Sequence, residues 1–239
     1  MASAAEREMR QAVVARCREY WPDGRVIHEL AIGGCRADLA VVTRSHLFAF
    51  EIKSSRDKLD RLENQFRFFD RATHGCFVVA DARWFETFSY DKGGEGFRPC
   101  EELRDYSWKS LGLWCYPEPE KGDWRTDMYR WRKPGQDFRF DERRQPRAGD
   151  LLGILLKEEL MLEARRHGVD IRSRWSVLPI ISAMAFEMTG KQVAEAVCRQ
   201  LRMRRFARAD PPVTPDGATP AWLDRAEPLS DASDRDTVG

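Results

Sequence analysis

Two short apolar segments joined by four residues constrain the fold of this chain more than any other feature. Residues 36–42 read RADLAVV and residues 47–55 read LFAFEIKSS. Both have the composition of β-strands, and the connection between them is short enough for an antiparallel hairpin. Residues 43–46 lack the Gly or Asn that favours a tight turn. A two-residue turn and a four-residue loop nevertheless give the same strand register.

That register brings charged side chains together. Ala40 lies opposite Ala49, and Asp38 lies opposite Glu51, with Cβ atoms of opposed residues roughly 4.5–5.5 Å apart. Because successive side chains on a strand point to opposite faces, Lys53 shares the face of Glu51. Two carboxylates this close repel each other unless a positive charge lies between them. A divalent cation such as Mg²⁺, which prefers oxygen ligands, would resolve the repulsion.

A simpler alternative is that these carboxylates are surface charges on an ordinary hairpin, since the pattern D…ExK is short and degenerate. The surrounding residues favour a function. Glu51 follows the run Leu-Phe-Ala-Phe and precedes Ile52, so it lies inside a strongly apolar strand. A charge in that position needs a reason, because its burial is costly.

Residues 58–72 have the periodicity of a helix, and Ser54 is a candidate for its N-cap. One apolar stripe is formed by Leu59, Leu62, Phe66 and Phe69. Lys58, Arg61 and Gln65 lie on a neighbouring face, again at helical spacing. A helix that leaves the ExK strand would direct this face towards the carboxylates, although a solvated helix face is the alternative.

A buried strand is predicted at residues 75–80, which read GCFVVA. With an amphipathic helix at residues 1–20, the predicted order is helix, three strands, helix and strand. This order describes a small α/β or α+β core.

The arrangement D…ExK, followed by a helix that carries Gln, resembles the PD-(D/E)xK nuclease superfamily. The longer string HELAIGGCRADLAVV…LFAFEIKSSRDKLDRLENQF…CFVVA is similar to a family of bacterial and phage proteins, the sce-seven-seven-two-six family. The matching residues are Glu29, Arg36, Asp38, Glu51, Lys53, Ser54, Asp57, Leu59, Arg61, Leu62 and Gln65. The resemblance covers most of residues 26–80 and, loosely, residues 149–205. A related exonuclease pattern has Tyr where this chain has Phe69. The resemblance implies a restriction-endonuclease-like core, with a short mixed sheet flanked by helices.

The resemblance also implies a metal-dependent site. Asp38, Glu51 and the backbone carbonyl of Ile52 would bind Mg²⁺ or Mn²⁺, which would lower the pKa of a bound water and neutralise charge on the phosphate. Lys53 would hold or help deprotonate the attacking water, and Gln65 would orient the water or a phosphate.

Further residues are assigned by the same resemblance. Glu29 would be an auxiliary ligand or would hold a metal-bound water, with Glu6 and Glu8 on the first helix as competitors for that role. Arg36, Lys58 and Arg61 are candidates for contacts with nucleic-acid phosphates. Arg36 has the alternative of pairing with a carboxylate.

Composition is that of a globular protein, with 42% hydrophobic and 33% charged residues and a formal net charge of +1 over 239 residues. Seven acidic and three basic residues follow Phe206, so the rest of the chain is modestly positive. That balance suits DNA or RNA but is common in other proteins.

The six cysteines form no CxxC motif, and we find no signal peptide and no long apolar run. We therefore expect a cytoplasmic protein with free thiols and no membrane association; its oligomeric state stays open.

Four stretches are expected along the chain. Residues 1–90 form the nuclease-like core with its N-terminal helix, and residues 91–148 form an irregular, aromatic-rich insertion that packs on the core. Aromatic and basic residues in its MYRWRKP string either stack on bases or anchor the insertion. Residues 149–206 are helical, with one helix expected at residues 151–162. Residues 207–239 are a disordered acidic tail.

The last predicted helix begins after Thr189 and ends in several arginines. Cations are favourable at a helix C-terminus, and contacts with a DNA backbone or a helix-turn-helix are the functional alternatives. Taken together, the sequence predicts a divalent-metal-dependent nuclease, with DNA favoured as substrate. An RNA- or tRNA-acting nuclease differs only in substrate, and a catalytically inactive DNA-binding or scaffold protein with the same fold is the alternative.

Overall fold

The computed structural model describes residues 4–89, 95–106, 112–121, 128–132 and 145–213. The first half contains α1 (Ala4–Tyr20), β1 (Arg25–Ile32), β2 (Cys35–Val42), β3 (Leu47–Lys53), α2 (Leu62–Ala72), β4 (Gly75–Asp81), β5 (Phe85–Ser89), β6 (Glu95–Pro99), α3 (Glu101–Arg104) and β7 (Gly112–Tyr116). The second half contains α6 (Ala148–Leu152), α7 (Lys157–Arg166), α8 (Val177–Glu187) and α9 (Gly190–Met203). The predicted mixed α/β fold with a helical C-terminal region is confirmed.

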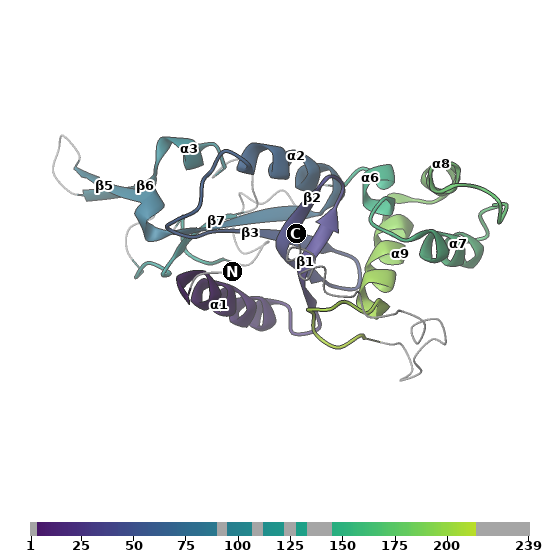
Figure 1. The fold of residues 1–239 in the computed structure, drawn as a ribbon, viewed down its shortest axis with the longest axis horizontal. Helices are drawn as coiled ribbons and strands as arrows, with labels where there is room; N and C mark the ends of the chain where they lie inside the picture. Colours follow the sequence, from purple (N-terminus) through teal and green to yellow (C-terminus); the bar gives the residue numbers. More distant parts are fainter. Residues whose placement is uncertain (1–3, 90–94, 107–111, 122–127, 133–144, 214–239) are drawn as a thin grey trace, which may run out of the picture.

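The main sheet has five strands in the order β1-β2-β3-β4-β7. β1, β2 and β3 form antiparallel pairs, whereas β3, β4 and β7 run parallel. α2 makes the crossover from β3 to β4, as a parallel connection requires. In Figure 1, α2 lies on one side of the sheet and α1 on the other, with α6 to α9 beyond one end and the hairpin of β5 and β6 beyond the other.

The predicted register of the first hairpin is confirmed where the pairing extends. Ala40 pairs with Ala49, and the last pair joins Val42 to Leu47. The turn needs no Gly because the hydroxyl of Thr43 accepts hydrogen bonds from the backbone N–H groups of Ser45 and His46. A local side-chain acceptor thus replaces the usual turn residues.

The sheet is buried on both faces. Every residue of β3 is buried, and its even-numbered side chains pack with α1, in a cluster that includes Met9, Val13 and Phe50. Odd-numbered Leu47 and Ala49 pack in the second cluster, under α2. Burial of these apolar side chains contributes about 25 cal/mol for each Å² removed from water, so both helices are fixed on the sheet by their apolar stripes.

The alternation of β1 and β2 changes phase at Glu29 and Asp38. In β2, Leu39 packs in the α1-side cluster, yet Ala37, two residues earlier, packs in the α2-side cluster. Glu29 has a φ of 58°, a left-handed conformation that is costly for a residue other than Gly. It lies opposite Asp38 in the register, between the pairs that flank it. The irregularity therefore falls at the predicted site.

Helix α2 begins at Leu62 and not at residue 58 as predicted. Ser54 does not cap it: the Ser54 N–H and hydroxyl both donate to the carboxylate of Asp57, at 2.6 Å each. Because this local turn competes with the helix, Lys58 and Arg61 lie on the segment that leads into α2. The expectation that Lys58 shares a helix face with Gln65 is wrong, whereas Arg61, at the N-cap of α2, has helical backbone angles and its carbonyl accepts from the N–H of Gln65 at 3.1 Å.

The C-terminal half also differs in detail from the prediction. The helix expected at residues 151–162 is divided into α6 and α7, whereas α9 begins after Thr189 as predicted, with the Thr189 side chain accepting from the N–H of Gln192. Residues 207–213, predicted to be disordered, instead lie along β1, where Arg208 and Asp210 share backbone hydrogen bonds with it. The rest of the predicted tail lies outside the described residues.

The described part of the predicted insertion packs on the core. Trp131 stacks on Trp114 with ring centroids 5.3 Å apart, and its indole N–H donates to the carbonyl of Cys115. Tyr129 contacts Phe85. These contacts favour the anchoring role for the MYRWRKP aromatics.

Among the described residues, no helix is long and apolar enough to span a membrane.

Candidate functional site

Asp38 is held by contacts from the neighbouring strand β3 and from helix α1. Its Oδ2 accepts a hydrogen bond from the backbone N–H of Ile52 at 2.8 Å. Its Oδ1 accepts from the guanidinium of Arg10 at 3.0 Å, and the same guanidinium donates to the Asp38 carbonyl at 2.7 Å. Ladder pairing between β2 and β3 ends at Leu39 and Phe50, one step before Asp38 would face Glu51. The Asp38 carboxylate thus accepts a hydrogen bond from the backbone N–H of Ile52, which lies beyond the last ladder pair.

Glu51, Lys53 and Gln65 form a connected polar group under α2. The Oε1 atom of Glu51 accepts from Lys53 Nζ at 2.9 Å and from Gln65 Nε2 at 2.7 Å. Lys53 Nζ also donates to Gln65 Oε1 at 3.3 Å. Gln65 lies beside the ExK strand as predicted, because α2 packs over the sheet directly after β3.

The second oxygen of Glu51 has no hydrogen-bond partner among the described residues, although the side chain is only 4% exposed. Burial raises the pKa of Glu51 to about 7, and the negative charge of Asp38 adds to the increase, while Lys53 and Gln65 oppose it. An unsatisfied buried carboxylate oxygen costs more than an unsatisfied neutral group. It is also an oxygen that can accept a further ligand.

The donor set fits a hard divalent cation. Asp38 and Glu51 influence each other electrostatically, and the Ile52 carbonyl lies in the chain between Glu51 and Lys53. The described part of the chain contains no group of three or more His, Cys, Asp and Glu residues that could hold a metal. A cation here would therefore have two carboxylates, with carbonyl, water and phosphate oxygens as its other ligands, which is the set that Mg²⁺ commonly uses.

Arg10 is the residue that sequence reasoning missed. It is only 8% exposed and it forms ion pairs with Glu6, Glu29 and Asp38 at 3.4, 3.5 and 3.0 Å. Its position next to Met9, at the edge of the buried stripe of α1, was the only available signal. The contact with Asp38 joins residues 28 positions apart, so local periodicity does not reveal it.

The structure partly separates Glu29 from the core of the site. Its carboxylate pairs with Arg36 at 2.8 Å as well as with Arg10. Of its two predicted competitors, Glu6 also contacts Arg10, whereas Glu8 accepts a hydrogen bond from Tyr116. The left-handed backbone places Glu29 beside Asp38, but both of its oxygens are engaged by arginines.

The predicted phosphate contacts are less well positioned. Arg36 is exposed and is paired with Glu29, which is the simpler alternative considered for it. Lys58 and Arg61 are exposed on the segment before α2. The structure thus brings Asp38, Glu51, Lys53 and Gln65 together and leaves the three predicted cationic residues at the surface around them.

The arginines at the end of α9 have structural partners. Arg199 forms two hydrogen bonds with Glu163, at 3.0 and 2.8 Å, and Arg204 pairs with Glu159. Arg202 donates to the carbonyl of Asp23. Eight of the fourteen residues of α9 are buried, so the helix has little surface to offer a DNA groove. These contacts favour the structural role over the helix-turn-helix.

Comparison with known protein families finds a similarity in the first part of the chain. A family model described as Bacteriophage P4 protein cII matches residues 1–89. This segment runs from α1 to β5 and includes every residue of the candidate site. No curated protein and no solved structure matches the chain.

Proposed function

We propose that this protein is a divalent-metal-dependent nuclease of the PD-(D/E)xK type that hydrolyses phosphodiester bonds in nucleic acid, with DNA favoured, in the cytoplasm. The observation that carries the proposal is the buried, unpartnered Oε2 of Glu51 beside Asp38 and Lys53. Retaining such a group has a substantial cost in folding free energy, and clusters with perturbed pKa values concentrate at functional sites.

In this proposal Asp38, Glu51 and the carbonyl of Ile52 hold Mg²⁺ or Mn²⁺. When bound, the ion supplies an acidified water and neutralises negative charge on the phosphate. Lys53 donates from Nζ, so it can hold the attacking water or stabilise the charge that develops on a phosphate oxygen. Its hydrogen bonds to Glu51 and Gln65 fix Nζ in place. Gln65 bonds both residues and sets their relative orientation.

Cleavage of labelled single- and double-stranded DNA in the presence of Mn²⁺ or Mg²⁺ tests the proposal. We expect Asp38→Asn and Lys53→Met to lower the rate by about a thousandfold, since each removes a ligand or a donor to the transition state. Lys191→Met is the matched control, because Lys191 is an exposed lysine on α9 whose side chain is 82% accessible. Equal rates in wild type, Asp38→Asn and Lys53→Met would contradict the mechanism.

A specific observation also supports the alternative of a catalytically inactive nucleic-acid-binding or scaffold protein. The guanidinium of Arg10 already supplies a positive charge to Asp38 and Glu29. Such a pairing could replace a metal ion as the partner of these carboxylates. Binding of DNA without cleavage of DNA or RNA, in either metal, would favour this alternative; cleavage of RNA alone would retain the enzyme and change its substrate.

A further inference from the structure

A second polar region lies on the α1 side of the sheet, away from α2. It is a pocket of about 430 Å³ between α1, β1 and the segment after α9. Arginines Arg7, Arg10, Arg18 and Arg208 line it, together with His28 and the apolar side chain of Val14. Pockets of this size hold small molecules or single groups of larger ones. None of the described residues that line it is acidic.

The pocket adjoins the irregularity of β1 at Glu29, because His28 lines it. His28 precedes the left-handed Glu29 and points to the α1 side, in contact with the pocket. Its backbone N–H donates to the carbonyl of Arg208 at 2.9 Å, which fixes the C-terminal segment beside β1. The Nδ1 atom of His28 is buried and has no hydrogen-bond partner in the described structure. A buried polar atom without a partner is uncommon in proteins, and the half-buried His28 that carries it lines the pocket.

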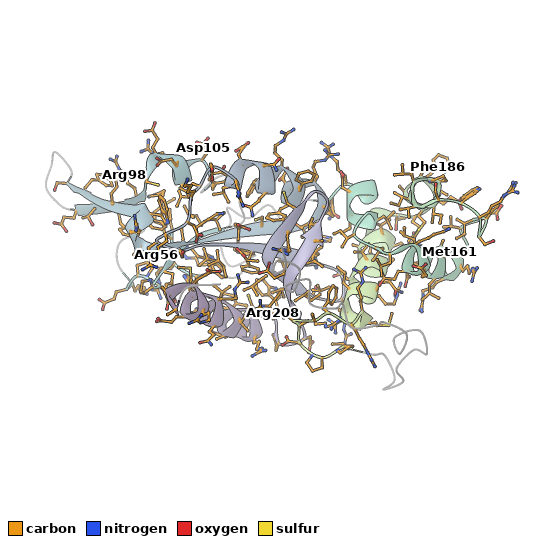
Figure 2. All side chains as sticks on the ribbon, viewed as in Figure 1. Arg56, Arg98, Asp105, Met161, Phe186 and Arg208 are labelled. Carbon is orange, nitrogen blue, oxygen red and sulfur yellow. The ribbon has the colours of Figure 1, made fainter. Side chains whose placement is uncertain are left out.

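The arginines of the pocket differ in how they are engaged. Arg10 is shared with the candidate site through Asp38 and Glu29, and Arg18 pairs with Asp210 at 2.7 Å. Arg208 is exposed, and its guanidinium has no hydrogen bond or ion pair with any described residue. Figure 2 shows Arg208 near the C-terminal end of α1. Its charge is therefore available to a ligand in the pocket.

We infer that this pocket binds a phosphate group of a nucleic-acid strand whose cleavage occurs at the candidate site. The inference rests on the proposed function for the identity of the strand. Arg208 provides the uncommitted positive charge, His28 lines the pocket with its imidazole ring, and Val14 provides an apolar wall for a sugar or base. Arg10 connects the two sites, because its guanidinium contacts Asp38 and its side chain also lines the pocket. The nucleic-acid strand would thus extend from Asp38 and Glu51, past β1, to the pocket beside α1.

Fluorescence anisotropy of a labelled short DNA strand tests the inference in EDTA, so that no cleavage occurs. We expect Arg208→Ala to weaken binding about tenfold at low salt, and to reduce the slope of log affinity against log salt by about 1. Arg208→Lys keeps the charge and should keep most of the slope. Arg174→Ala is the matched control, since Arg174 is exposed and belongs to the segment between α7 and α8, two helices that lie far from α1 in Figure 1.

Two forms of the strand distinguish the source of the phosphate. If the effect of Arg208→Ala requires a 5′-phosphorylated end, the pocket holds a terminal phosphate. If strands with a 5′-hydroxyl show the same loss, it holds an internal phosphodiester. Unchanged affinity and slope for Arg208→Ala with both strands would overturn the inference, and thermal melting of each variant checks that it is folded.

The binding experiment on Arg208→Ala and the cleavage experiment on Lys53→Met can fail independently of each other. Loss of cleavage in Lys53→Met together with normal strand binding by Arg208→Ala would retain the nuclease and reject the pocket. Weakened strand binding by Arg208→Ala in a protein that cleaves nothing would retain the pocket and reject the nuclease.

Discussion

The protein buries glutamates in two regions and satisfies them differently. In the helical C-terminal region, Glu163 is fully buried, and both of its carboxylate oxygens accept hydrogen bonds from Arg199. In the sheet, Glu51 is almost as buried, but one of its oxygens is unpartnered. The polar atom left without a partner in the helical region is the neutral amide oxygen of Gln200, which costs less to bury than a charge.

The difference separates a structural carboxylate from a candidate functional one. A buried ion pair with complete hydrogen bonding fixes the packing of two helices, as Glu163 does between α7 and α9. A buried carboxylate with an open position keeps a coordination site at the cost of folding free energy. Variants of the two glutamates should therefore differ in their effects on stability and metal binding.

The largest effect on stability is expected from Glu163→Ala. The variant leaves Arg199 without its carboxylate partner, so the free energy of unfolding should fall by about 3–5 kcal/mol. Urea denaturation measures the change. Glu86→Ala is the control, since it breaks the exposed pair of Glu86 and Arg98 and should cost less than about 1 kcal/mol. Equal losses in the two variants would remove the distinction between the regions.

Glu51 should make stability depend on pH. Because its pKa in the folded protein is raised from 4.5 to about 7, the folded state binds this proton more tightly than the unfolded state. Its contribution is complete below about pH 4.5 and is lost as the pH rises through 7, by an amount on the order of 3 kcal/mol. Unfolding measured against pH should show this loss in wild type. Glu51→Gln should be free of it, and an identical pH profile in the variant would contradict the assignment.

Divalent metal should stabilise the sheet region specifically. Mn²⁺ at ten times its dissociation constant should raise the free energy of unfolding by about 1.4 kcal/mol. The increase should be largest above pH 7, where the proton no longer competes for Glu51. Thermal melting with and without EDTA measures it. Asp38→Asn should abolish the increase, whereas a Mn²⁺ effect of the same size in that variant would place the metal elsewhere.

The smallest effect is expected from Arg10→Met. Removing the guanidinium leaves Asp38 without a positive partner and leaves Glu29 paired with Arg36 alone, so Mn²⁺ should bind several-fold more tightly, by about 1 kcal/mol. Isothermal titration with Mn²⁺ in the absence of nucleic acid measures the change. Loss of Mn²⁺ binding would instead show that Arg10 holds Asp38 in a position that binding requires.

Much of the fold around the candidate site follows from local sequence signals. The alternation in residues 36–42 and 47–55 predicted the hairpin and its register, and the apolar stripe with Gln65 predicted a helix over the ExK strand. These elements depend on neighbours in the sequence. The start of α2 was predicted too early because the side chain of Asp57 captures Ser54, a competition that periodicity does not describe.

The rest of the site depends on contacts between distant residues. Arg10 contacts Asp38 across 28 positions of sequence, next to the left-handed Glu29, and periodicity within one element does not describe such a contact. The segment at residues 207–213 has the composition of a tail, yet its backbone is ordered by β1 and by Arg25, which donates to the carbonyl of Asp210. Composition alone does not reveal that a segment will be ordered by contacts with residues distant in the sequence.

That segment has a consequence for the synthesis of the chain. β1 is an outer strand of the main sheet, and its free side is covered by residues 207–213 through the pairing of Ile27 with Ala209. Exposed strand edges invite pairing with other chains. A nascent chain therefore carries an open edge on its first strand until the residues after α9 have left the ribosome. Protection of β1 against association is thus encoded in the segment that follows α9.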